Sequence, residues 1–250
     1  MATYVLIGGA WIGAWAWQRV ARTLRAQGHD VYPATLTGLA EREHLARPET
    51  DLEVHLTDVL NLLRYEDLSR VLLVGHSYSG IVVEGVADRA PERLAGVVYV
   101  DSGPLGDGAA HIDLYPPPAR EAVEATVARE GDGWRLPFPG IEALGQQASL
   151  AGLDDAARSL LASRASPQPF RTYLQPLRLT RPGSGDYERA VIACNDFRAL
   201  RDAGVPQITA LSGTGWRWLE LDTGHWPMLS TPEALAAHLH RLAPPEPQES

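Results

Sequence analysis

A serine, a histidine and an aspartate, far apart in this sequence, could together perform nucleophilic catalysis. Ser77 stands in the stretch Val71-Leu-Leu-Val-Gly-His-Ser-Tyr-Ser-Gly80, where an apolar run ends in glycine and small residues follow the serine. This pattern predicts a strand, a tight turn and a helix, with the Ser77 hydroxyl exposed at the turn and the helix N-terminus directed at it. Gly75 and Ser79 are small enough to let the backbones of strand and helix approach each other.

A serine hydroxyl is a weak nucleophile near neutral pH and needs an adjacent base. Histidine is the natural base, because its unperturbed pKa lies close to physiological pH. His225 lies between a predicted strand and the last predicted helix. A loop in that position reaches the carboxyl edge of a parallel sheet, so we expect His225 to face Ser77 across that edge.

The third member of such a site is a carboxylate that holds the imidazole in the correct tautomer. Asp196 and Asp101 each follow an apolar run that predicts a strand. We favour Asp196, because it gives the chain order Ser77, Asp196, His225, and we keep Asp101 as the alternative acid. Each has a simpler interpretation: Asp196 as a helix N-cap, and Asp101 as part of a plain turn.

The elements that must position these residues alternate between strand and helix. Continuous apolar runs predict strands buried on both faces, at residues 4–7, 31–34, 71–74, 97–100, 190–194 and 216–221. Helical spacing and capping signals predict helices at residues 15–27, 50–63, 79–89 and 232–242. The alternation predicts an α/β fold with a mostly parallel, doubly wound sheet.

Between residues 102 and 186 the alternation stops and no core strand is predicted. Proline and glycine are frequent there, and short helices are expected at residues 120–129, 153–163 and 170–177. We interpret residues 102–186 as a mostly helical cap inserted into a core formed by residues 1–101 and 187–242. The proline-rich, polar stretch 243–250 is expected to be a disordered tail.

Composition excludes several classes of function. The chain has 250 residues, a formal charge of -9 and no lysine among its 22 basic residues, so we expect no nucleic-acid partner and no mechanism that needs a catalytic lysine. The single cysteine, Cys194, rules out an intrachain disulfide. With neither a basic leader nor a long apolar span, we expect no membrane association and a cytoplasmic protein, either a monomer or a homodimer.

The chain order and placement of these residues resemble the α/β-hydrolase superfamily, and more narrowly its small esterase and hydroxynitrile-lyase-like branch. The opening Leu6-Ile-Gly-Gly-Ala-Trp-Ile-Gly-Ala-Trp-Ala-Trp17 is similar to that branch's H-G-A-x-H-G-x-W-x-W segment. The closing Thr223-Gly-His-Trp-Pro-Met-Leu-Ser-Thr-Pro-Glu233 is similar to its G-x-H-x-x-M-x-x-x-P-E segment. The resemblance spans residues 4–241 and is weakest across the insertion.

The resemblance implies a carboxylesterase-like serine hydrolase with an α/β-hydrolase fold. Its oxyanion hole would consist of the backbone N–H groups of Ala10 and Tyr78. The substrate would be a small to medium, apolar ester, lactone or thioester, cleaved through an acyl-enzyme. This chain has Gly8 where the family usually has histidine. It has Trp226 where the lyase members carry lysine, which argues against cyanohydrin chemistry.

Two other functions stay open on the sequence alone. One is a non-hydrolytic enzyme of the same fold, a lyase, cyclase or cofactor-free oxygenase, in which the Ser/His pair transfers protons. The other is a silent binding protein, which would have no need of an intact set of three catalytic residues.

The pocket and the absence of cofactors are also predicted from the residues. We expect the aromatic side chains of Trp11, Tyr115 and Trp226 to line the substrate pocket. His76, beside the nucleophile, is expected to be structural, with its side chain directed away from Ser77. The histidines outside these motifs lack metal-ligand spacing, so neither a metal nor another cofactor is predicted.

Overall fold

The computed structural model describes residues 1–181 and 185–244 of the chain. The predicted tail at residues 243–250 lies, from residue 245 on, outside the described residues.

A six-stranded parallel sheet forms the centre of the molecule, with the strand order β2-β1-β3-β4-β7-β8. Its strands are β1 (Thr3–Ile7), β2 (Asp30–Ala34), β3 (Val71–His76), β4 (Leu94–Val100), β7 (Glu188–Ala193) and β8 (Arg217–Glu220). The direction in which the chain adds strands reverses between β1 and β3. In open α/β sheets, ligands bind at the carboxyl ends of the strands beside such a reversal. The loops after β1 and β3 carry Ala10 and Ser77.

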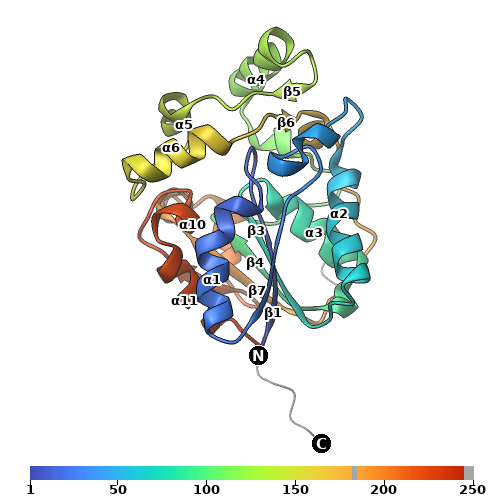
Figure 1. The fold of residues 1–250 in the computed structure, drawn as a ribbon, viewed down its shortest axis with the longest axis vertical. Coiled ribbons are helices and arrows are strands. Elements are labelled where there is room, and N and C mark those ends of the chain that lie inside the picture. Colours follow the sequence, from blue (N-terminus) through green and yellow to red (C-terminus); the bar gives the residue numbers. More distant parts are fainter. Residues whose placement is uncertain (182–184, 245–250) are drawn as a thin grey trace, which may run out of the picture.

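Helices cover both faces of this sheet (Figure 1). One face carries α1 (Gln18–Ala26), α10 (Pro227–Ser230) and α11 (Pro232–Arg241), and the other carries α2 (Leu52–Tyr65) and α3 (Ser79–Arg89). The strands β1, β3 and β4 are almost wholly buried, as their continuous apolar sequences require when both faces are covered. The prediction of an α/β fold with a mostly parallel, doubly wound sheet is confirmed.

The segment between β4 and β7 lies over the carboxyl ends of the strands (Figure 1). It contains α4 (Pro117–Glu130), α5 (Ile141–Gln147), α6 (Asp155–Arg164) and α7 (Arg171–Leu174). Two short strands, β5 (Arg135–Leu136) and β6 (Gln168–Pro169), lie on either side of α5 and α6 in the chain and form an antiparallel pair separate from the main sheet. We call them the cap strand pair. Treating 102–186 as a separate cap remains our proposal for the domain boundaries.

Further short helices connect these elements. They are α8 (Asn195–Asp202), α9 (Pro206–Thr209) and the 3₁₀ turns η1 (Ala14–Trp17), η2 (Ala40–Leu45), η3 (Pro91–Arg93), η4 (His111–Leu114) and η5 (Ala210–Ser212). The helix predicted at 15–27 is therefore divided into η1 and α1. The helix predicted from residue 50 starts later, because Asp51 is its N-cap and accepts a hydrogen bond from the Val54 backbone N–H at 3.2 Å.

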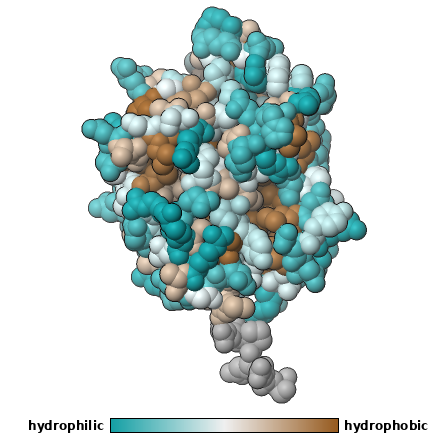
Figure 2. Space-filling view, viewed as in Figure 1, coloured by the Kyte–Doolittle hydropathy of each residue, from teal (hydrophilic) through white to brown (hydrophobic). Residues whose placement is uncertain are grey.

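The surface seen in Figure 2 is mostly hydrophilic, with several separate apolar patches. Across residues 1–181 and 185–244, every helix is too short or too polar to cross a membrane.

Candidate active site

Ser77 occupies the sharp turn between β3 and α3, with a φ of 51°. This left-handed conformation is costly for a residue with a side chain and persists only where the surroundings impose it. Two contacts from the end of the neighbouring strand β4 impose it here. The Ser77 N–H donates to the Val100 carbonyl at 3.2 Å, and the Ser102 hydroxyl donates to the Ser77 carbonyl at 2.6 Å.

Gly75 allows β3 and α3 to approach each other closely below this turn. A Cβ atom at Gly75 would lie 2.5 Å from the Cγ2 atom of Val83 and 2.8 Å from the Ser79 carbonyl oxygen. Real Cβ atoms do not come this close to their neighbours. The glycine is therefore needed for the approach of helix to strand, as the sequence pattern predicts.

A line of hydrogen bonds runs from Ser77 to a buried carboxylate. The Ser77 hydroxyl lies 2.9 Å from Nε2 of His225, and Nδ1 of His225 lies 2.6 Å from Oδ2 of Asp101. The other carboxylate oxygen of Asp101 accepts from the Cys194 backbone N–H at 2.8 Å. Only 1% of the Asp101 side chain is exposed, so both of its oxygens depend on these protein donors.

The preference for Asp196 as the acid is corrected by these contacts. Asp196 lies in the first turn of α8, and its Oδ2 accepts from the Ser149 backbone N–H at 2.6 Å. Asp101 follows β4 directly, and β4 neighbours the strand that carries Ser77. Because the helix starts at Asn195, it turns the Asp196 carboxylate towards the 102–186 segment, whereas Asp101 stays at the strand end beside His225.

Two backbone N–H groups near Ser77 remain available to a ligand. Ala10 follows β1, Tyr78 follows Ser77, and neither N–H donates to a protein acceptor within the described part of the chain. The Ser79 hydroxyl, at the start of α3, donates to the Gly8 carbonyl and so ties the loop after β1 to this helix. The expectation that Ala10 and Tyr78 form an oxyanion hole stays a prediction.

The His76 side chain hydrogen-bonds the backbone carbonyl of His225. Its Nε2 lies 2.7 Å from the His225 carbonyl oxygen, and the two rings are 4.7 Å apart. Burial lowers the pKa of His76 well below its ordinary value, and the nearby His225 lowers it further. A neutral His76 donates from Nε2 to the carbonyl and places no second positive charge beside His225.

The three predicted pocket residues lie in different surroundings. Trp226 packs edge-on against His225, with ring centroids 4.8 Å apart. Trp11 follows Ala10 and packs against Phe138 of the 102–186 segment. Tyr115 lies earlier in that segment and packs beside Tyr173. Their role in binding substrate remains a prediction.

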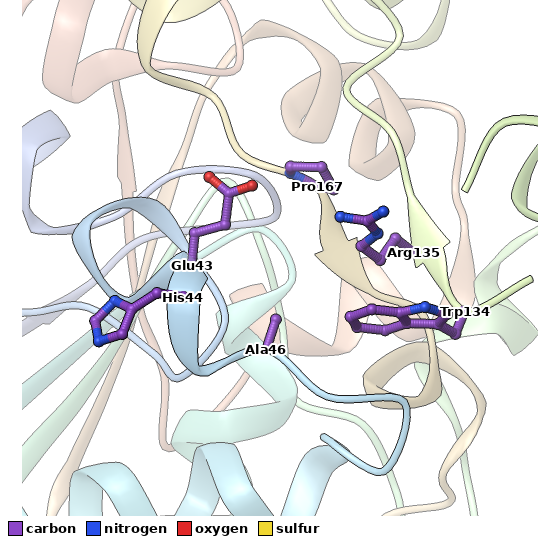
Figure 3. Close-up of a pocket in the computed structure, with 6 residues that line it drawn as sticks. All are labelled: Glu43, His44, Ala46, Trp134, Arg135 and Pro167. Carbon is purple, nitrogen blue, oxygen red and sulfur yellow. The ribbon is translucent and has the colours of Figure 1, made fainter. Parts of the chain in front are cut away.

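Two surface cavities lie away from Ser77 and His225. The first, of about 430 Å³, lies where η2 faces the cap strand pair (Figure 3), and its lining residues are Glu43, His44, Ala46, Trp134, Arg135 and Pro167. The second, of about 590 Å³, follows the edge strand β2 and the outer side of α2, from Tyr32 to Tyr65. Neither has a triad-like set of side chains in its lining.

The side chain of Tyr78 is anchored by a buried histidine that sequence reasoning did not single out. The Tyr78 hydroxyl lies 2.9 Å from Nδ1 of His55, and Nε2 of His55 lies 2.9 Å from the Thr37 carbonyl oxygen. The carbonyl can only accept, so Nε2 carries the hydrogen and Nδ1 accepts from Tyr78. Burial lowers the pKa of His55 to about 4, which keeps this arrangement neutral. In the sequence His55 is one apolar-face position of a helix and gives no sign of this contact.

Within residues 1–181 and 185–244 no three His, Cys, Asp or Glu side chains are grouped so that they could hold a metal ion.

Comparison with known proteins shows the family to which the chain belongs. The model of the alpha/beta hydrolase family matches residues 4–238. A carbendazim hydrolyzing esterase from Nocardioides sp. (strain SG-4G) is 33% identical, over 97% of this chain and 100% of that protein. Methylesterase 9 from Arabidopsis thaliana is 25% identical, over 97% of this chain and 98% of that protein.

The structural comparison agrees with this assignment. An extracellular alpha/beta-hydrolase from a Paenibacillus species, described as sharing homology with tobacco salicylic acid binding protein 2, has a TM-score of 0.84 and 21% identity. The comparison covers 98% of this chain and 100% of that one. The chain belongs to the α/β-hydrolase family, in its esterase-like branch. The prediction of an enzyme of this fold that acts on esters is confirmed at that level.

Proposed function

We propose that this chain is a serine esterase in which Ser77 is the nucleophile, His225 the general base and Asp101 the acid that orients it. The continuous line of hydrogen bonds, 2.9 Å from Ser77 to His225 and 2.6 Å from His225 to Asp101, carries the proposal. Asp101 accepts from Nδ1–H, so in the neutral imidazole of His225 it is Nε2 that is unprotonated and can accept the Ser77 proton. This is the tautomer that general-base catalysis requires.

In the proposed reaction, the Ser77 oxygen attacks the ester carbonyl carbon while His225 takes the hydroxyl proton. The N–H groups of Ala10 and Tyr78 bind the oxyanion of the tetrahedral intermediate, and each such donor typically contributes about 3 kcal/mol to its stabilisation. His225 then gives the proton to the leaving alkoxide, which departs as an alcohol. Water, deprotonated by His225, releases the acyl group as a carboxylic acid and restores Ser77.

The proposed substrate is a small to medium, apolar ester. The relatives named as a carbendazim hydrolyzing esterase and as methylesterases support esters of small alcohols as the first compounds to test. Trp226, a residue that is 4% exposed, packs edge-on against His225, and this apolar neighbour of the catalytic base favours an apolar substrate group. Lactones and thioesters share the same carbonyl chemistry and belong in the same panel.

The test is steady-state hydrolysis of methyl esters, lactones, thioesters and carbendazim by the wild type and by Ser77→Ala. We expect the wild type to release acid from at least one ester, and Ser77→Ala to lose this activity by on the order of 10⁴-fold or more with an unchanged circular dichroism spectrum. Equal hydrolysis by the two proteins would contradict the proposal. Turnover without an acyl-enzyme would favour the non-hydrolytic proton-transfer alternative instead.

A further inference from the structure

Trp11 has an unusual backbone conformation beside the proposed oxyanion donor Ala10. Its φ is 64°, in the left-handed region that residues with side chains rarely adopt. A conformation of this kind persists only where neighbouring groups hold it. The peptide group before Trp11 joins it to Ala10, and the Ala10 N–H belongs to the preceding peptide group, between Gly9 and Ala10. Contacts that hold Trp11 therefore restrain the carboxyl side of Ala10 and limit how far its N–H can turn.

The groups that hold Trp11 come from the 102–186 segment. Its backbone N–H donates to Oε1 of Gln168 at 3.3 Å, and its carbonyl accepts from the Ser166 N–H at 2.9 Å. Its indole N–H donates to the Leu136 carbonyl at 3.2 Å, and its ring packs edge-on against Phe138 at 6.0 Å. All four partners lie in or beside the cap strand pair, formed by β5 and β6.

Gln168 is the central contact of this set. It is completely buried, so both ends of its amide need partners. Oε1 takes the Trp11 N–H, and Nε2 donates to the Thr172 hydroxyl at 2.8 Å. The Thr172 hydroxyl in turn donates to the Pro169 carbonyl at 2.6 Å, which fixes the direction of the amide.

The same network reaches the second proposed oxyanion donor. Thr172 is completely buried, and the next residue, Tyr173, stacks on the Tyr78 ring with the ring centroids 5.5 Å apart. Gln168 therefore connects Trp11, next to Ala10, with Tyr78, next to Ser77, through Thr172 and Tyr173. On the core side, the loop is held at Gly8 by the Ser79 hydroxyl. The segment from Gly8 to Trp11 is thus fixed at one end by α3 and at the other by the cap strand pair.

We propose that Gln168 is a positioning residue for the oxyanion hole: through Trp11 and Thr172 it fixes the Ala10 N–H relative to the Tyr78 N–H. The cap strand pair then sets the rate of the chemical step in addition to covering the site. This inference rests on the proposed esterase function. Because the contacts act on the donors of the transition state and not on the bound ester, loss of Gln168 affects kcat and leaves KM nearly unchanged.

The test compares Gln168→Met with a matched control, Gln147→Met, which changes an exposed glutamine in α5 of the same segment. Methionine has similar length but can neither accept from Trp11 nor donate to Thr172. We expect Gln168→Met to lower kcat about 10- to 100-fold with KM within about threefold, and to weaken a trifluoromethyl ketone inhibitor by a similar factor. The control should match the wild type in all three quantities.

Two further measurements separate positioning from a loss of folding. Thr172→Val removes the anchor of the Gln168 amide and should lower kcat in the same direction, whereas Thr172→Ser, which keeps the hydroxyl, should restore it. Hydrogen exchange of the peptide containing residues 8–12 should become faster in Gln168→Met, while that of the β3 peptide stays unchanged.

The outcomes are distinguishable. A wild type without Ser77-dependent ester hydrolysis would overturn the proposed function and this inference with it. A wild type that hydrolyses esters, beside a folded Gln168→Met with unchanged kcat or unchanged exchange at residues 8–12, would overturn the positioning role alone. An equal fall in kcat for Thr172→Ser and Thr172→Val would also count against it.

Discussion

At the scale of single residues, Asp101 and Asp196 differ in what their carboxylates contact. The Asp101 carboxylate accepts hydrogen bonds from Nδ1 of His225 and from the Cys194 N–H, whereas the Asp196 carboxylate accepts one from the backbone N–H of Ser149. Both follow a strand in the sequence, and both precede His225. Chain order alone therefore does not separate them. What separates them is whether a helix begins before the carboxylate.

This difference predicts opposite results for two matched substitutions. Asp101→Asn keeps the shape of the side chain but can stabilise the wrong tautomer of His225, so we expect kcat to fall on the order of 10³- to 10⁴-fold. Asp196→Asn, in the same assay, should leave kcat within about threefold, because its contact is with the Ser149 backbone. Steady-state kinetics on the best ester found measures both. A larger loss in Asp196→Asn than in Asp101→Asn would contradict the assignment.

At the scale of elements, the strands and helices that carry Ser77 and His225 follow from local sequence signals. The helix predicted at residues 79–89 has these same bounds in the structure, because glycine and serine before it and the end of an apolar run define its start. The fold class follows from the alternation of buried strands and amphipathic helices. The loops that complete the site carry no comparable periodic signal.

The contacts made by the 102–186 segment could not be predicted in this way. Gln168 stands between two prolines in a stretch without helical or strand periodicity. Its partner Trp11 lies 157 residues earlier in the chain. Such a contact depends on how the segment folds back over the sheet. The choice between Asp101 and Asp196 failed for a related reason, since it depends on the exact residue at which α8 begins.

The close approach of β3 and α3 gives a prediction for Gly75. In Gly75→Ala the new methyl group would lie 2.8 Å from the Ser79 carbonyl oxygen, which belongs to the backbone and cannot rotate away. We expect this overpacking to lower the free energy of unfolding by about 1–3 kcal/mol. Urea unfolding measures the change. Gly106→Ala is the control, since a Cβ atom there meets nothing within 4 Å, and equal stability of the two variants would contradict the prediction.

At the scale of the whole molecule, two buried histidines make stability depend on pH. Burial lowers the pKa of His55 and of His111 from 6.5 to about 4 in the folded protein. As the pH falls below 6.5, the unfolded chain takes up protons that the folded protein does not. The stability contributed by the two neutral side chains is therefore complete above pH 6.5, is lost between pH 6.5 and about 4, and changes no further below that.

The size of this effect can be measured on a variant. Between pH 7 and pH 5, each histidine should lower the free energy of unfolding by about 2 kcal/mol. This follows from 1.36 kcal/mol per pH unit over the roughly 1.5 units between the unfolded-state pKa of 6.5 and pH 5. His55→Gln removes one of the two groups, so its stability should fall by about 2 kcal/mol less than that of the wild type between pH 7 and 5. Urea unfolding at both pH values gives the difference, and equal losses in the two proteins would show that His55 is not the source.

The central claim is that His225 activates Ser77 as a nucleophile. The most direct measurement is reaction of the purified protein with a fluorophosphonate reagent, followed by mass spectrometry to locate the modified residue. We expect a single adduct on Ser77 in the wild type, and almost none in folded His225→Ala, because the serine hydroxyl then lacks its base. Folded wild-type protein that stays unmodified, or that is modified at another serine, would contradict the account.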